Sequence, residues 1–179
     1  MASTPDVRVR SNTPPAGEPR PGSSTWGRWQ PWVSTVLRLG LAAVAFAAGF
    51  PKITDIPVSV RAVRAYEILP ESLVPTAGIV LPMVEIILGV LLLLGLFTRF
   101  SAMAFGGLMV VFVLGIASAW ARGLTIDCGC FGGGGVVDAD QTQYPLEILR
   151  DLALLAAATV LAWRPRSRLS LDQTLGLGH

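Results

Sequence analysis

The chain has 179 residues, which suits one domain, and its mean hydropathy is +0.58 with 52% hydrophobic residues. Only 15% of the residues are charged, against about 25% in soluble domains, so the composition favours a membrane protein over a soluble one. The formal charge of +2 and the scattered basic residues argue against nucleic-acid binding.

The first 28 residues form a polar stretch with almost no large apolar side chains. It is interrupted by Pro5, Pro14, Pro15, Pro19 and Pro21. Such a stretch cannot bury enough surface to offset its ordering entropy. We therefore expect a disordered cytoplasmic tail over residues 1–28, a transmembrane domain over residues 29–164, and a cytoplasmic C-terminal tail over residues 165–179.

Four apolar segments follow, at roughly residues 32–50, 74–97, 100–120 and 146–163. A helix needs about 20 residues to cross a hydrocarbon core of about 30 Å, which the second and third segments satisfy easily. The first and fourth segments are weaker because they carry charge near their ends, where long side chains reach the interface. These charges are Arg38, Glu147, Arg150 and Asp151. The sequence predicts an all-α fold, a four-helix transmembrane bundle.

The first apolar segment has a second interpretation, as the apolar region of a secretory signal peptide with small residues at a cleavage site near residues 45–47. The polar stretch before it is far longer than the usual start of a signal peptide, so a membrane helix is favoured.

Charge placement predicts the orientation in the cell membrane. Arginines occupy the N-terminal flank, the short link at Arg99 and the C-terminal flank, whereas the two long loops are mixed or acidic. The positive-inside rule therefore places both termini in the cytoplasm and both long loops outside, in a multi-pass protein.

The first outer loop contains a predicted short helix. Asp55 can cap a helix that starts near Pro57 and runs to Leu69, and apolar and charged residues alternate along it. We expect an interfacial helix on the outer membrane surface. The alternative is a connector that packs over the bundle.

The second outer loop holds both cysteines, in the stretch Asp127-Cys128-Gly129-Cys130-Phe131-Gly132. A compartment outside the cytoplasm permits disulfides, and strained, exposed pairs tend to exchange. We expect Cys128 and Cys130 to face outward as a redox pair open to a partner. No cation is adjacent in the sequence, and Asp127 disfavours a thiolate on Cys128, so a strongly activated nucleophile is not predicted.

Two other interpretations of the cysteine loop stay open. The first is a structural disulfide, but a bond between residues two apart encloses almost no loop and so stabilises little. Zinc needs four ligands, and His179 is the sole histidine, at the opposite face of the predicted bundle. A pair of thiolates could bind Cu(I), but no methionine cluster in the sequence supports such a site. We therefore predict no metal site.

Glu85 lies midway along the second apolar segment, about 17 Å below its outer end at about 1.5 Å per residue. A carboxylate at this depth should be protonated or paired. Arg38 approaches that depth from the inner side and Arg150 from the outer side. We expect Arg150 and Asp151 to lie close to the outer interface, beneath the cysteine loop. The site is either a proton or quinone site or a polar clamp between helices.

Several of these residues resemble a known group of membrane proteins. The stretch Gly49-Phe50-Pro51-Lys52, with Tyr66, Pro70, Leu81-Pro82, Glu85 and Gly89, resembles the DoxX-like proteins. The Cys128-Gly129-Cys130-Phe131-Gly132 motif, followed by Arg150-Asp151, is similar to their MauE (methylamine utilisation) branch. The resemblance covers roughly residues 32–163.

The resemblance implies a four-helix membrane bundle that works with a thioredoxin-like partner outside the cytoplasm in the maturation of secreted proteins. It implies Cys128 and Cys130 as the exchanging pair. Lys52, Glu85 and Arg150 are then structural or shape a quinone-like pocket, and quinone is the one cofactor suggested. The alternative is a non-catalytic scaffold subunit of a DoxX-type complex, with the cysteines as a passive staple.

Overall fold

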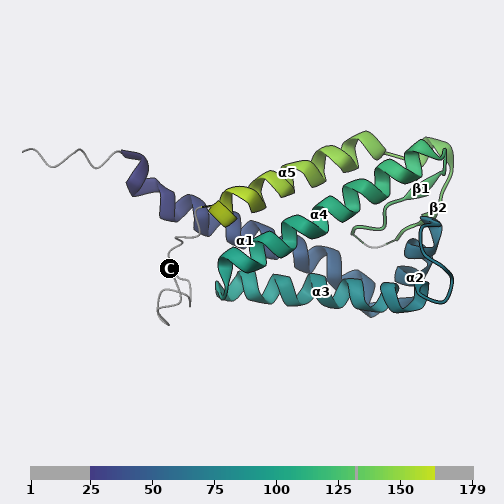
Figure 1. Cartoon of the computed structure of the whole chain (residues 1–179), viewed down its shortest axis with the longest axis horizontal. Coiled ribbons are helices and arrows are strands. Elements are labelled where there is room, and N and C mark those ends of the chain that lie inside the picture. The colour runs from purple at the N-terminus through teal and green to yellow at the C-terminus, as the bar shows by residue number, and fades with distance from the viewer. Residues whose placement is uncertain (1–24, 132, 164–179) are drawn as a thin grey trace, which may run out of the picture.

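The computed structural model describes residues 25–131 and 133–163 (Figure 1). Within these residues the fold is mostly helical. The helices are α1 (Thr25–Thr54), α2 (Ile56–Ala65), α3 (Val74–Leu94), α4 (Thr98–Ala121) and α5 (Tyr144–Trp163), with a short 3-10 turn, η1 (Ala139–Gln141). The strands are β1 (Ile126–Asp127) and β2 (Gly135–Val136). The expected tails lie outside the described residues, except that residues 25–28 already belong to α1.

Three helices of the described part are long and apolar enough to cross a membrane: Pro31–Thr54 within α1, all of α3 and all of α4. They correspond to the first three predicted segments. Helix α5 corresponds to the fourth segment and has 20 residues, but its first turns are rich in charge. The helices turn large apolar side chains outward, among them Val36, Ile87, Phe100 and Leu114, as expected of surfaces in contact with lipid.

The long helices pack mainly in two pairs, α1 with α3 and α4 with α5 (Figure 1). Glycines allow α1 and α3 to approach each other closely. A Cβ on Gly49 of α1 would lie 2.8 Å from Ile86 and 3.2 Å from the Cβ of Glu85, so the two helices could not approach as they do with any larger residue. The contact brings Lys52, one turn after Gly49, to the level of Glu85.

Helix α2 packs over the bundle as the connector alternative predicts. The carboxylate of Asp55 accepts a hydrogen bond from the Val58 amide at 3.2 Å, which confirms the predicted cap. The buried Ser59 hydroxyl donates to the Gly78 carbonyl of α3 at 2.7 Å. The helix ends at Ala65 rather than Leu69, because Glu67 takes a left-handed conformation (φ 50°) that interrupts it.

The two strands form an antiparallel hairpin in which Ile126 pairs with Val136 and Asp127 with Gly135. The hairpin lies between α2 on one side and the α4–α5 pair on the other (Figure 1). The cysteine loop is the turn of this hairpin and therefore points into the space between the two helix pairs.

Candidate functional site

The cysteine loop is anchored at both of its ends. The hydroxyl of Tyr144, the first residue of α5, accepts a hydrogen bond from the Ile126 amide at 2.9 Å and donates to the Leu124 carbonyl. The Asp127 carboxylate accepts from the amides of Gly129 at 3.1 Å and Gly134 at 3.3 Å. Asp127 therefore closes the loop on itself, a role its sequence position alone did not reveal.

Two glycines press the loop against α2. Gly129 (φ 65°) and Gly134 (φ 91°) both take left-handed conformations that favour glycine. A Cβ on Gly129 would lie 2.9 Å from the Cβ of Ala62, and one on Gly134 would lie 2.6 Å from it. The contact with α2 thus depends on both residues lacking a side chain.

The prediction that the cysteine pair is exposed to a partner is wrong. Cys128 is 9% exposed and Cys130 is 6% exposed. The glycines let α2 cover the loop, and the Tyr66 hydroxyl at the end of α2 donates to the Cys128 carbonyl at 3.1 Å. Burial raises the pKa of Tyr66, which keeps its hydroxyl a proton donor in this contact.

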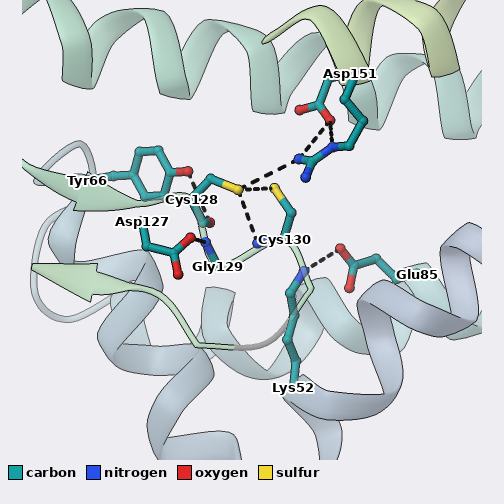
Figure 2. Close-up of polar contacts among 9 residues, drawn as sticks. Lys52, Tyr66, Glu85, Asp127, Cys128, Gly129, Cys130 and Asp151 are labelled. Carbon is teal, nitrogen blue, oxygen red and sulfur yellow. Dashed lines mark hydrogen bonds and ion pairs between the residues drawn. The ribbon is translucent and has the colours of Figure 1, made fainter. Parts of the chain in front are cut away.

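Both cysteines are free thiols whose Sγ atoms lie 2.8 Å apart (Figure 2). A disulfide bond needs about 2.05 Å, so a small movement of the sulfurs suffices to join them. The Cys128 sulfur also accepts from the Cys130 amide at 3.3 Å and faces Nη2 of Arg150 at 3.7 Å.

These contacts make the two thiols unequal. The hydrogen bond that the two thiols share, together with the Cys130 amide and Arg150, outweighs burial and lowers the pKa of Cys128. The same thiol–thiol hydrogen bond, followed by burial, raises the pKa of Cys130. Cys128 is therefore the sulfur that loses its proton more readily, and Cys130 is the one that holds its proton more tightly.

No cation adjoins the cysteines in the sequence, but the fold brings Arg150 to them, as its expected place beneath the loop allows. Arg150 is 22 residues from Cys128 in sequence, but α5 runs past the hairpin and brings its guanidinium to the sulfur. The ring of Phe131, inside the cysteine loop, lies 4.8 Å from the guanidinium carbon and fixes its plane. Arg150 also pairs with Asp151, with Nη2 3.1 Å from Oδ1.

Asp151 is almost completely buried, at 2% exposure. Its Oδ1 is held by Arg150, whereas its Oδ2 has no hydrogen-bond partner among the described residues. A buried oxygen with no partner is uncommon and points to a bound proton or to another group at that position.

Glu85 pairs with Lys52 rather than with Arg38 or Arg150. Lys52 Nζ lies 2.6 Å from Glu85 Oε1, and both side chains are buried. Arg38 instead donates to the carbonyls of Leu92 and Leu93 at 3.1 Å, because it lies near the other end of α1 and meets the last turn of α3. Glu85 Oε2 has no hydrogen-bond partner in the described part of the chain.

The two ion pairs flank the cysteine loop. Figure 2 shows Asp151 on one side of Cys128 and Cys130, and Lys52 with Glu85 on the other. Lys52 is also close enough to Asp151 for their charges to interact. We call Lys52, Glu85, Arg150 and Asp151 the polar cluster. Three of its members are the residues that the sequence predicts for a quinone-like pocket, and Asp151 is the addition.

Glu147 is a further neighbour that sequence reasoning did not assign to the site. Oxygens of Asp127 and Glu147 and the sulfur of Cys128 all lie within 4.8 Å of one another. The available signal was helical spacing, because Glu147, Arg150 and Asp151 fall three and four residues apart on α5 and so share one face. That face is turned toward the hairpin.

Comparison with known proteins agrees with these observations. The family model described as "Methylamine utilisation protein MauE" matches residues 30–164. A methylamine utilization protein MauE of Paracoccus denitrificans is 34% identical over 134 residues, 74% of this chain and 70% of that protein. The MauE protein of Methylorubrum extorquens is 36% identical over 135 residues, 75% of this chain and 70% of that protein. No solved structure matches the chain.

Proposed function

The chain belongs to the MauE family of methylamine utilisation proteins, and from that premise we propose that it is a membrane thiol–disulfide relay. In this proposal Cys128 and Cys130 exchange with a thioredoxin-like partner outside the cytoplasm during the maturation of secreted or periplasmic proteins. Methylamine utilisation is the process that the family name suggests for the client.

The unequal pair of thiols is the observation that carries the proposal. A passive buried cysteine sits among apolar neighbours, whereas Cys128 faces a guanidinium and a backbone amide. Cys130 lies within 2.8 Å as a second sulfur. A stabilised thiolate beside a protonated thiol is what dithiol exchange requires.

The exchange balances within the two proteins. One thiolate of the reduced partner attacks Cys130 Sγ of the Cys128–Cys130 disulfide, and Cys128 leaves as a thiolate beside Arg150. The second partner thiolate then attacks the partner sulfur of the mixed disulfide and releases Cys130. The partner becomes a disulfide, the chain becomes a dithiol, and both partner protons end on Cys128 and Cys130. A leaving thiol of low pKa departs faster, which suits Cys128.

Burial sets a condition on this chemistry. A partner can reach the sulfurs only after the packing around the loop opens, and the contact of Gly129 and Gly134 with Ala62 of α2 is part of that packing. The glycines add no side chains to this contact, and the hydrogen bond from Tyr66 to the Cys128 carbonyl is a polar anchor that must break when the loop opens. The loop is thus closed at rest and opens to react.

The polar cluster fits the proposed quinone-like pocket in its chemistry. Lys52, Glu85 and Arg150 would hold the head group, because the unpartnered Glu85 Oε2 is a buried acceptor and the two cations are donors. A quinone, when bound, supplies an acceptor of two electrons and two protons. Lys52 and Glu85 lie on α1 and α3, two of the helices suited to crossing a membrane, where such a lipid-soluble acceptor resides.

The proposed topology has four crossings, with α5 as the fourth, both termini in the cytoplasm and the hairpin outside. The charges of α5 support its crossing because two of them, Arg150 and Asp151, pair with each other next to the hairpin rather than facing lipid. In this proposed topology the cysteines lie in a compartment that permits disulfides.

A second function, a non-catalytic scaffold of a DoxX-type complex, is favoured by the burial of both cysteines. In that case the pair is a passive staple within the loop that packs between α2 and the α4–α5 pair. The two functions differ in what happens when the sulfurs are removed.

The test replaces the cysteines in the full-length protein in its native membrane. Cys128→Ser and Cys130→Ser should each abolish client disulfide formation, and Cys130→Ser should also abolish the mixed disulfide with a thioredoxin-like partner, while complex assembly persists. Val136→Ser, at an exposed position of the same hairpin, is the matched control and should leave both unchanged. Normal client disulfides in the cysteine variants, with assembly intact, would establish the scaffold.

A further inference from the structure

Arg150 is shared by two groups that can each carry negative charge. Its guanidinium pairs with Asp151 Oδ1 at 3.1 Å and faces Cys128 Sγ at 3.7 Å. The Asp151 side chain is 3% exposed, and its second oxygen has no partner in the described part of the chain. One cation therefore stands between a buried carboxyl and a buried sulfur.

The charge balance of the polar cluster limits how many of these groups can be ionised. Lys52 and Arg150 balance Glu85 and Asp151 when both cysteines are thiols. A thiolate on Cys128 adds an uncompensated negative charge to a buried site, which is costly. The cost is avoided if the proton that leaves Cys128 stays inside the cluster.

We propose that Asp151 holds the proton that Cys128 gives up, so that Arg150 pairs with one anion at a time. While Cys128 is a thiol, Arg150 pairs with the Asp151 carboxylate. Once Asp151 is a carboxylic acid, Arg150 pairs with the Cys128 thiolate. The inference deepens the proposed function and rests on its assignment of Cys128 as the reactive sulfur.

The step moves one proton and no electrons. A hydrogen leaves Cys128 Sγ as a proton and binds the Asp151 carboxyl, for which the unpartnered Oδ2 is the free position. The total charge of the cluster is the same before and after. When Cys128 later forms a disulfide, that proton is already separated from the sulfur.

Other ionisable groups surround this pair, and their charges act on both states. They are Asp127 and Cys130 of the hairpin, Tyr66 at the end of α2, Glu147 of α5, Lys52 of α1 and Glu85 of α3. Glu147 is the closest rival as proton acceptor, because its oxygen lies within 4.8 Å of the Cys128 sulfur. It has no contact with Arg150 among the hydrogen bonds and ion pairs of the described residues, so it cannot release the guanidinium to the sulfur.

The first test measures alkylation of Cys128 by iodoacetamide in the purified full-length protein. A Cys130→Ser background leaves one thiol and keeps a hydroxyl donor beside it. Asp151→Asn keeps the acceptor for Arg150 but removes the charge, so alkylation at pH 7 should rise roughly tenfold, the equivalent of about one pKa unit. If Asp151 merely anchored Arg150, the weaker anchor would leave the rate unchanged or lower it, which would overturn the proposal.

A double-variant comparison isolates the part played by Arg150. In an Arg150→Gln background the shared cation is absent, so Asp151→Asn should no longer accelerate alkylation. An acceleration of the same size in both backgrounds would mean that Asp151 acts on Cys128 directly through its charge. The proposal that Arg150 switches from Asp151 to Cys128 would then be refuted.

The second test locates the proton by infrared spectroscopy. In the Cys130→Ser protein a protonated-carboxyl band should be present when Cys128 is a thiolate. It should disappear in Asp151→Asn and also in the Cys128→Ser/Cys130→Ser variant, where no thiol donates. The band should survive Glu147→Gln. Its loss in Glu147→Gln, or its persistence without Cys128, would overturn the proposal. Neither test uses the thioredoxin-like partner. Failure of the proposed relay would therefore be detected separately, as loss of the predicted effects on client disulfides.

Discussion

Cys128 and Cys130 carry the same thiol group but have different neighbours. Cys128 faces Arg150 and the Cys130 amide, whereas no hydrogen-bond donor beyond the neighbouring thiol reaches the Cys130 sulfur within the described residues. The same peptide turn therefore holds one sulfur poised to be an anion and another poised to be a thiol. The distinction assigns the leaving group and the attacked atom of the proposed exchange.

Alkylation should distinguish the two sulfurs. Because the pKa of Cys128 is lowered and that of Cys130 is raised, a small alkylating reagent near neutral pH should modify Cys128 first. Its rate should fall as the pH drops through the lowered pKa, since the thiolate is the reactive form. Fragment mass spectrometry of the modified peptide checks this, and preferential modification of Cys130 would refute the assignment.

Gly134 should be intolerant of a side chain. Gly134→Ala forces a Cβ to within 2.6 Å of Ala62 and strains a left-handed backbone, so we expect a loss of about 1–3 kcal/mol and faster alkylation of Cys128. Gly123→Ala is the matched control, because Gly123 is also left-handed (φ 69°) but has no atom within 4 Å. Thermal unfolding in detergent reports the stability. Equal effects at both positions would show that contact with α2 is unimportant.

At the scale of elements, the α1–α3 pair depends on a buried ion pair. Lys52→Met leaves Glu85 as an unpaired charge in the protein interior and should cost about 3–5 kcal/mol. The double variant Lys52→Met/Glu85→Met removes both charges and should be clearly more stable than the single variant. Thermal unfolding in detergent measures both.

The control for this pair is Arg64→Met, which breaks an exposed ion pair with Glu71 and should leave the unfolding midpoint unchanged. If the double variant were no more stable than Lys52→Met, the instability of the single variant would not come from the unpaired charge of Glu85. A polar clamp with a further role, such as binding a head group, would then be favoured.

The elements were predictable where local pattern decides them. Long apolar runs mark α1, α3 and α4, and Asp55 before Pro57 marks the start of α2. The pairing of Lys52 with Glu85 was not predictable, because it depends on how closely α1 crosses α3 at Gly49. The contact between Arg150 and Cys128 depends likewise on the hairpin folding back toward α5.

At the scale of the whole molecule, composition and charge placement predict a membrane protein, and the apolar helices together with the family confirm that coarse result. The exposure of the cysteines was predicted wrongly because glycine-rich loops are usually solvent-facing. Here the glycines serve close packing against Ala62 instead. Whether a flexible loop faces outward depends on its neighbours, which a single sequence does not specify.

The proposed orientation can be tested on intact cells. Val136 of β2 is 81% exposed, so Val136→Cys in a Cys128→Ser/Cys130→Ser background should react with a membrane-impermeant maleimide from outside. Arg99→Cys, at an exposed position in the first turn of α4, is the control and should react only after permeabilisation. The reverse pattern would place the hairpin in the cytoplasm and remove the oxidising compartment from the proposal.

The hairpin lies where the α1–α3 pair and the α4–α5 pair diverge (Figure 1). Because the sulfurs lie between those pairs, we expect a change in helix tilt to alter the packing around the hairpin and the reactivity of its thiols. Lateral pressure and bilayer thickness act on that tilt. The surrounding lipid thereby gains influence over two sulfur atoms that it never touches.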